Sequence, residues 1–164
     1  MGIIHFRVDD RLIHGIVAGY WVNHLQATRI MIIDDESSQN EIVRTSLRMA
    51  CPKSVNLSVL DTEKAIKNIQ AGNYETQRVF VIVKSPDVLL KLSDAGIPVP
   101  EIYLGNITYT EGRLKVAKTV SLNQAEIETC ESFIKRGTRL ISQLIPKDNA
   151  EDFGVLLHNA KSRK

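Results

Sequence analysis

Short runs of β-branched and aliphatic residues alternate along the chain with polar segments that have a helical period. Five runs have the length and composition of buried strands: residues 3–8, 29–33, 55–59, 78–83 and 101–104. A polar or turn segment follows each run, and a helical pattern follows each of the first four. Repeated strand–helix–strand units of this kind predict an α/β fold, with a mostly parallel open sheet flanked by helices on both faces.

Residues that favour helix ends agree with this division. Thr62 can cap the helix that follows the third strand, and Ser85 followed by Pro86 is typical of another helix start. Residues 123–126 resemble a capping box, and Gly137 suits the left-handed position that often follows a helix. These signals predict helices where the hydrophobic period also places them.

The remaining segments carry weaker signals. Residues 138–145 alternate as a final strand, and residues 105–120 lack a helical period and predict a loop with a short strand or hairpin. Residues 149–164 are weakly amphipathic and predict a frayed terminal helix. No repeat, low-complexity stretch or linker interrupts the sequence, so we expect a single domain over residues 1–164.

The charge balance and the cysteines argue against several classes of protein. With 21 Lys and Arg against 19 Asp and Glu, the 164-residue chain has a formal net charge of +2, which gives no overall attraction to nucleic acid or anionic lipid. Cys51 and Cys130 form no Cys-x-x-Cys pair, and no two histidines have metal-ligand spacing, so we expect neither a disulfide framework nor a metal site. No apolar run approaches the roughly 20 residues of a membrane helix, so we expect a cytoplasmic protein.

Charged and polar side chains gather directly after the predicted strands. In an open parallel sheet the carboxyl ends of the strands share one edge, and the loops there form the crevice in which ligands bind. We therefore expect carboxylates, basic side chains and a histidine to share one rim. The rim residues are Asp9, Asp10, Arg11, His14 and Gly15 after the first strand, Asp34 and Asp35 after the second, Asp61 and Thr62 after the third, Lys84 and Ser85 after the fourth, and Gly105 and Asn106 after the fifth.

His14 is the most informative residue of this rim. It directly precedes Gly15 and a predicted helix over residues 16–25, and a helix N-terminus offers N–H groups and a partial positive charge to an anion. A neutral imidazole there can attack a phosphoryl group, without a metal or cofactor, and Arg11 can offer a planar fork of donors to the phosphate oxygens. The alternative is structural: His14 starts the helix and bonds to a neighbouring aspartate.

Other rim residues have structural interpretations of equal merit. Asp10 can support the site or accept hydrogen bonds as a cap, and Asp34 and Asp35 carry the same ambiguity.

Two residues outside the rim are given structural roles. His5 lies inside the first strand and is interpreted as structural. Trp21, on the first predicted helix, is interpreted as a packing residue.

The run Asp9-Asp10-Arg11-Leu12-Ile13-His14-Gly15 resembles a motif of the IIB components of the mannose/sorbose class of the bacterial phosphoenolpyruvate-dependent sugar phosphotransferase system. The resemblance continues through Trp21, the Ile-Ile-Asp-Asp run at 32–35, the Lys84-Ser85-Pro86 segment and the Leu104-Gly105-Asn106 loop, and it reaches Pro146. It covers almost the whole chain and identifies a family rather than a fold alone.

The resemblance implies a sheet of about seven strands and the activity of a phosphohistidine carrier. The histidine that matches His14 accepts a phosphoryl group on Nδ1 from a phosphorylated IIA protein. It then passes the group to a sugar translocated by the membrane IIC and IID permease, with which the protein would associate peripherally. The motif's basic positions fall on Arg7 and Arg11, which are assigned to the phosphate together with the backbone of Gly15 and Ile16.

Two departures from the family pattern affect the rim. Ile16 stands where the family usually has Gln, so an amide side chain is lost beside the histidine, and Asn106 stands where a second glycine is common. A supporting or partner-contacting role is assigned to five further residues, which are Asp10, Asp34, Asp35, Lys84 and Ser85.

Two other functions remain open on the residues alone. In a receiver-type signalling domain, Asp9 and Asp10 would hold magnesium with Asp61, which would accept the phosphoryl group. That function needs a lysine at the end of the fifth strand, where this chain has Leu104-Gly105-Asn106, and it leaves His14 without a role. A regulatory module that binds a ligand without turnover is the third possibility, although no glycine-rich dinucleotide motif supports it.

Overall fold

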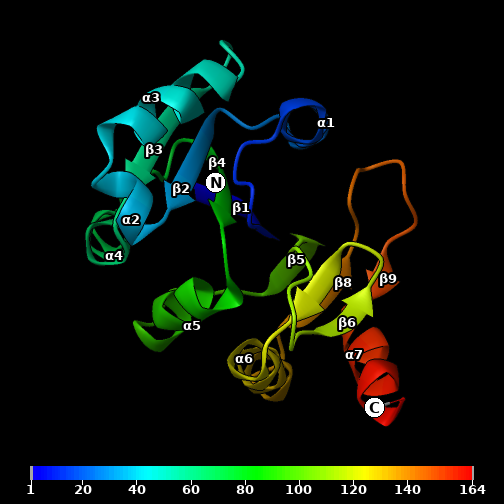
Figure 1. The fold of residues 1–164 in the computed structure, drawn as a ribbon. Helices are drawn as coiled ribbons and strands as arrows, with labels where there is room; N and C mark the ends of the chain where they lie inside the picture. Colours follow the sequence, from blue (N-terminus) through cyan, green and yellow to red (C-terminus); the bar gives the residue numbers. More distant parts are fainter. Residues whose placement is uncertain (1, 164) are drawn as a thin grey trace.

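The computed structural model describes residues 2–163, apart from the side chains of Ile16 and Val17. A central sheet with helices on both sides makes up the molecule (Figure 1). In chain order the elements are β1 (Gly2–Asp9), α1 (Gly15–Leu25), β2 (Arg29–Ile33), α2 (Asp35–Ser38), α3 (Glu41–Ala50), β3 (Asn56–Leu60), α4 (Thr62–Gln70), β4 (Arg78–Val83), α5 (Pro86–Asp94), β5 (Glu101–Asn106), β6 (Leu114–Ala117), β7 (Val120–Leu122), α6 (Gln124–Lys135), β8 (Arg139–Ser142), β9 (Glu151–Asp152) and α7 (Phe153–Ser162).

The main sheet has seven strands in the order β3-β2-β4-β1-β5-β8-β9. Every pairing from β3 to β8 is parallel, and only β9 runs antiparallel to its neighbour β8. The α/β class, the mostly parallel sheet and its seven strands are therefore confirmed. Because β1 to β5 and β8 all run in one direction, the segments that follow them meet at a single carboxyl edge.

The two faces of the sheet bury separate apolar clusters, because side chains alternate along each strand. On one face α1 and α3 cover a cluster that includes Trp21, Ile30 and Phe80. On the other face α4, α5, α6 and α7 cover a larger cluster that includes Val8 and Val81. Each such side chain, once fully buried, contributes roughly 1.5–3 kcal/mol, so both helix layers are held by the hydrophobic effect.

Capping residues fix the helix starts, with one correction to the sequence analysis. Ser85 caps α5, and Asn123 forms the expected capping box at α6 with Glu126. Thr62 was expected to cap α4, but the cap is Asp61, whose carboxylate accepts the Lys64 N–H at 2.7 Å. The prediction was wrong by one residue because Asp35 takes both the backbone N–H and the hydroxyl of Thr62.

The C-terminal segment differs from the expected frayed helix. Phe153, Leu157 and Ala160 of α7 are buried in the larger cluster. Lys161 also pairs with Glu131 on α6. The helix is therefore packed onto the body of the protein rather than frayed. The hairpin expected within residues 105–120 is formed by β6 and β7, and it extends two residues beyond the predicted segment, to Leu122.

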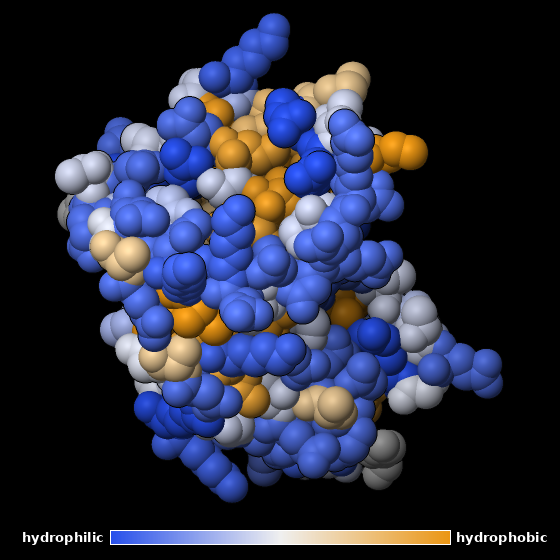
Figure 2. All heavy atoms as spheres, turned by 90° about the vertical axis from the view of Figure 1, so that its left-hand side faces the viewer, coloured by the Kyte–Doolittle hydropathy of each residue, from blue (hydrophilic) through white to orange (hydrophobic). Residues whose placement is uncertain are grey.

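The surface is largely polar. Figure 2 looks onto the left-hand side of Figure 1, where hydrophilic side chains cover most of the face and apolar ones show through in patches. Among the described residues of the chain, Ile42 and Met49 of α3 are the most exposed large apolar residues. Within residues 2–163, no helix has both the length and the apolar character needed to span a bilayer.

Candidate functional site

The chain turns sharply where β1 ends, and Asp9 organises the turn. The Asp9 carboxylate accepts the backbone N–H of Arg11 at 2.9 Å, an arrangement that reverses the chain locally. Leu12 then adopts a left-handed backbone conformation with φ of 59°, which costs a non-glycine residue roughly 1–2 kcal/mol. Burial of the Leu12 and Ile13 side chains beneath α1 stabilises this conformation. The turn therefore directs two apolar side chains inward and leaves the next residue outside.

His14 is that next residue, and its side chain is exposed at the N-terminus of α1. Its backbone is extended, its carbonyl accepts the Ala18 N–H, and its imidazole makes no capping hydrogen bond. Gly15 follows with a positive φ of 37°, which glycine adopts without strain as the chain enters the helix. Among the described residues, no hydrogen bond or ion pair engages the imidazole, so the expected alternative of a bond to a neighbouring aspartate is not what the structure has. The ring is therefore exposed and unpaired among the described residues.

Arg11 is held beside this turn by Asp9. Its Nε and Nη2 donate to the two carboxylate oxygens at 3.1 and 3.2 Å, while a third of its side chain stays exposed. Asp9 itself is buried, so its charge is poorly solvated and depends on this pairing. The arrangement orients the guanidinium and leaves Nη1 without a described partner. Arg11 can therefore offer a fixed donor to an anion at the N-terminus of α1.

Asp10 braces the turn from the opposite side. Its carboxylate accepts the Asn106 side-chain amide and the Thr108 backbone N–H, both at 2.8 Å. The Asp10 N–H also donates to the Asn106 carbonyl at 2.9 Å. Asp10 thus joins the end of β1 to the segment after β5, which supports the structural interpretation of this residue. Asn106, a departure from the family pattern, supplies a donor that glycine lacks.

Arg7 does not lie where the sequence analysis placed it. Its residue exposure is 1%, its Nη1 and Nη2 donate to the Gln143 and Leu144 carbonyls at 2.9 and 2.6 Å, and its guanidinium carbon lies 4.8 Å from the centre of the Trp21 ring. The interpretation of Arg7 as a direct phosphate ligand is therefore wrong. In a strand, Arg7 shares a face with Asp9, so its side chain enters the interior under α1.

The residues after β2 and β4 form a second polar group at the same edge. Asp34 caps α2 through Ser37 and pairs with Lys84 Nζ at 3.3 Å. Thr62 donates two hydrogen bonds to Asp35, which lower the pKa of that carboxyl. Ser85 caps α5. These contacts connect neighbouring loops to one another. Lys84 directly follows β4, the strand that pairs with β1, and its side chain is directed toward Asp34.

The strand order argues against the receiver-type alternative. Asp61 follows β3, and β2 and β4 separate β3 from β1, which carries Asp9 and Asp10. Neighbouring strands are about 4.8 Å apart, so the ends of β3 and β1 are separated by roughly 14 Å. Among the described residues, no three His, Cys, Asp or Glu side chains come together to hold a metal ion. The structure therefore gives no support to the receiver-type alternative.

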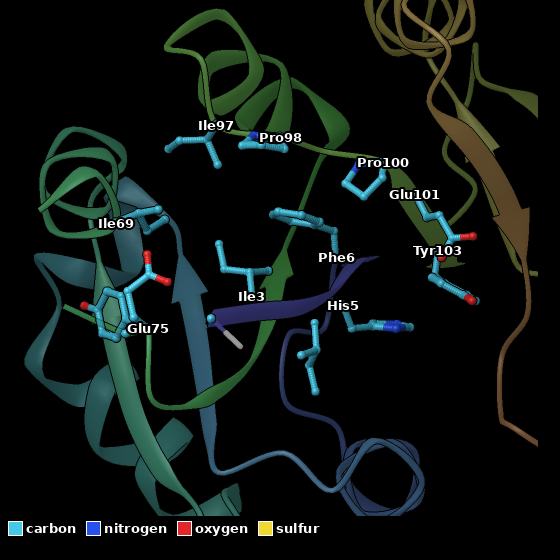
Figure 3. A pocket seen from close by; sticks show the side chains of 13 residues that line it. Ile3, His5, Phe6, Ile69, Glu75, Ile97, Pro98, Pro100, Glu101 and Tyr103 are labelled. Carbon is cyan, nitrogen blue, oxygen red and sulfur yellow. The ribbon is translucent and has the colours of Figure 1, made fainter. Parts of the chain in front are cut away.

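A pocket of about 370 Å³ lies at the opposite, amino edge of the sheet (Figure 3). It opens because β5 pairs with β1 only from Tyr103 onward, and the preceding Pro98 and Pro100 have no N–H to extend the ladder. His5 lines it and stacks on Tyr103, and burial together with the charge of Arg7 lowers the pKa of His5 to about 3. This pocket contains none of the candidate site residues, and His5 is a neutral packing residue as expected.

The rim thus contains one compact candidate site, made by the turn after β1. Asp10, Arg11, His14 and Gly15 come together there, and the backbone of Ile16 lies in the first turn of α1, whereas its side chain is outside the described residues. Sequence reasoning missed Asp9 as the group that orients Arg11. The alternation of side chains along β1 could have indicated this role, because consecutive residues at the end of a strand, here Asp9 and Asp10, point to opposite sides. The same turn thus contains an exposed imidazole at a helix N-terminus and a guanidinium held by Asp9, which are the kinds of group that phosphoryl transfer requires.

Comparisons with known proteins agree with this chemistry. A family model described as the PTS system sorbose subfamily IIB component matches residues 3–164. The chain is 28% identical over 159 residues to the fructose-specific EIIB component of Bacillus subtilis (strain 168), which covers 97% of this chain and 98% of that protein. It is 28% identical over 142 residues to the mannose-specific EIIAB component of Escherichia coli (strain K12), which covers 87% of this chain and 44% of that protein. The crystal structure of the IIBSor domain of the sorbose permease from Klebsiella pneumoniae is similar with a TM-score of 0.92 and 28% identity, over 97% of this chain and 98% of that one.

Proposed function

Because the chain belongs to the sorbose subfamily of IIB components of the sugar phosphotransferase system, we propose that His14 is the residue that carries its phosphoryl group. IIB components are phosphotransferases, and the chain acts in phosphoryl transfer linked to sugar uptake. The single observation that supports His14 most is its exposed imidazole, which has no described partner, at the N-terminus of α1. An anion formed on that ring would lie where backbone N–H groups and the helix dipole stabilise negative charge.

Transfer to His14 proceeds by in-line displacement between two histidines. A ring nitrogen of neutral His14 attacks phosphorus, the P–N bond of the donor phosphohistidine breaks, and the donor imidazole keeps the electron pair. In the second step a sugar hydroxyl attacks phosphorus, the P–N bond to His14 breaks, and the departing ring nitrogen keeps the electron pair, so that the imidazole can take up the hydroxyl proton. The protein contributes mainly position and charge, so Arg11, oriented by Asp9, stabilises the phosphoryl oxygens together with the N–H groups of Gly15 and Ile16.

The partners follow from the family. We propose that a phosphorylated IIA protein is the donor, which the combined EIIAB relative supports in kind. We also propose that the acceptor is a sugar presented by membrane IIC and IID components, so that the protein works in the cytoplasm at the permease. The relatives' names include fructose and mannose, so the sugar of this chain is not assigned.

Labelling with a cognate donor tests the proposal. Phosphoenolpyruvate, the general phosphotransferase proteins and the IIA partner should label the chain once, and His14→Ala should abolish acceptance. Because His14 is exposed and holds no described contact, its loss should change the free energy of unfolding by less than about 0.5 kcal/mol. Full labelling of a folded His14→Ala variant would contradict the proposal.

A further inference from the structure

Arg7 is a buried cation without a carboxylate partner among the described residues. Burial lowers its pKa to about 10, so it stays charged at neutral pH, and its buried Nε has no hydrogen-bond partner among the described residues. Burying a charge in this way costs free energy that apolar packing at the same place would not. The structure compensates in part, through two carbonyl acceptors, the face of Trp21 and the negative charge of nearby Asp9, which pairs directly with Arg11 rather than with Arg7. The segment that contains these two carbonyls indicates the role of Arg7.

Both carbonyls belong to the turn of residues 143–148, which follows β8. Because β8 runs parallel to β5, this turn begins at the same carboxyl edge as the His14 turn. It has its own internal structure, since the Gln143 side chain donates to the Asp148 carbonyl at 2.9 Å and the Asp148 N–H donates to the Ile145 carbonyl at 3.0 Å. The 143–148 turn therefore has hydrogen bonds of its own in addition to those that attach it to Arg7 and Trp21.

The attachment reaches across β5 to β1 and α1. Leu144 carbonyl accepts Arg7 Nη2 at 2.6 Å and Trp21 Nε1 at 2.8 Å, so one oxygen is held from both elements. Gly105 of β5 lies directly under the guanidinium, and a Cβ added there would lie 2.3 Å from Nη2. Only glycine leaves room for the arginine at this crossing. In Figure 1 the β8–β9 connection rises on the side where α1 lies.

The 143–148 turn presents partly exposed apolar side chains and a cation next to α1. Leu144, Ile145 and Pro146 are half-buried, and Lys147 is exposed. A protein partner that brings a phosphoryl group to His14 must cover the surface around the start of α1, and this turn adjoins the helix. Lys147 is followed by Asp148, which is also exposed, so the turn carries no net charge, and its partly exposed apolar side chains are the feature that suits a protein partner.

We infer that Arg7 is a positioning residue, which holds the 143–148 turn as part of the surface that receives the phosphorylated IIA donor. This inference rests on the proposed role of His14 as the acceptor. Arg7 acts through the turn and does not touch the phosphate. A guanidinium presents two N–H donors in a fixed planar fork to two consecutive carbonyls, whereas an apolar side chain has no donor and a lysine ammonium has no such fixed geometry.

Two phosphoryl donors separate this role from the chemistry of His14. Arg7→Met, which keeps the length of the side chain but removes its donors, should raise the KM for phosphorylated IIA about tenfold and leave kcat nearly unchanged. Labelling by phosphoramidate, a small donor that needs no docking surface, should stay within about twofold of the parent because His14 is untouched. Gly105→Ala should act in the same direction by displacing the guanidinium, and Trp21→Phe, which removes one donor to Leu144, should have a smaller effect.

Matched variants control for general loss of packing. Arg78 also donates to two consecutive carbonyls, those of Leu25 and Gln26, but at the amino edge of the sheet, so Arg78→Met should leave the KM for IIA unchanged. Gly19→Ala adds the same methyl group as Gly105→Ala where nothing lies within 4 Å. If Arg7→Met does not fold, Gly105→Ala and Trp21→Phe give the same information.

Three results would overturn the inference. Acceptance of phosphate from IIA at the parental KM by folded Arg7→Met and Gly105→Ala would make Arg7 a purely structural residue. Labelling by both donors could instead fall by the same factor, which would mean that Arg7 acts on His14 itself. If Arg78→Met raises the KM for IIA as much as Arg7→Met does, the change in KM is a result of lost stability and not of a displaced 143–148 turn. Failure of the proposed function is distinct, because the parent would then take no label at His14 from either donor.

Discussion

Replacing Arg11 perturbs the candidate site at one identifiable contact. The Arg11 guanidinium donates to both oxygens of the buried Asp9 carboxylate, and in the proposed function it also donates to the phosphoryl group on His14. A charge-assisted hydrogen bond to an anion contributes about 1.5–3 kcal/mol, which corresponds to a roughly ten- to hundredfold change in rate. Arg11→Ala should therefore slow phosphoryl transfer by that factor.

The same variant should also lose stability, because Asp9 would be left buried without its partner. Removing one member of a fully buried pair costs about 3–5 kcal/mol, but Arg11 is one-third exposed, so we expect about 1–2 kcal/mol. Arg11→Lys keeps the charge without the fork and should fall between the parent and Arg11→Ala.

Single-turnover transfer from labelled IIA at fixed salt measures the rate, and urea unfolding measures the stability of the same samples. Asp9→Asn is the matched control, since it keeps the shape of the acceptor, weakens the hold on Arg11 and leaves the guanidinium in place. It should slow transfer less than Arg11→Ala. If folded Arg11→Ala transfers as fast as the parent, the phosphate is held by backbone N–H groups alone, and the role given to Arg11 is wrong.

Three further predictions concern groups around the site and in the core. Asn106→Gly removes one of two hydrogen bonds on Asp10 and should slow transfer by no more than roughly fivefold in the same assay, so a hundredfold loss would assign Asn106 to the chemistry itself. His5 has its pKa lowered to about 3 from 6.5, so the unfolded chain binds a proton in that window and the folded chain does not. The free energy of unfolding should therefore fall by up to about 1.4 kcal/mol for each pH unit below about 6.5. If urea unfolding of His5→Phe has the same pH dependence as the parent, this prediction is wrong. Asn123→Ala removes the capping box of α6 and should lower the free energy of unfolding by about 1 kcal/mol, with no change in transfer rate.

The strands were predictable from sequence because their signal is local. Runs such as 29–33 and 78–83 are continuous and apolar, as strands buried on both faces must be, and both have the predicted bounds in the structure. Helix starts were predictable where the cap has one interpretation, as at Ser85. At α4 two neighbouring residues could cap, and a tertiary contact from Asp35 decided between them.

The site was predictable only in part, for the same reason. His14 was selected as a candidate by its position before a helix, and Asp10 and Arg11 by their neighbourhood in the motif, and the structure shows all three in one turn after β1. Arg7 was misplaced because proximity in sequence was given more weight than the alternation of a strand, which turns its side chain into the interior. Its partners, Gln143 and Leu144, lie more than 130 residues away, so nothing local could have indicated them.

Identifying the labelled residue and its linkage tests the central claim most directly. The chain is phosphorylated through IIA, digested under alkaline conditions, and the phosphorylated peptide is sequenced by mass spectrometry. We predict a single label on His14 that survives alkali and is lost in acid, as expected of a phosphohistidine. A label on any other residue, or one released by alkali as an acyl phosphate on an aspartate is, would contradict the account.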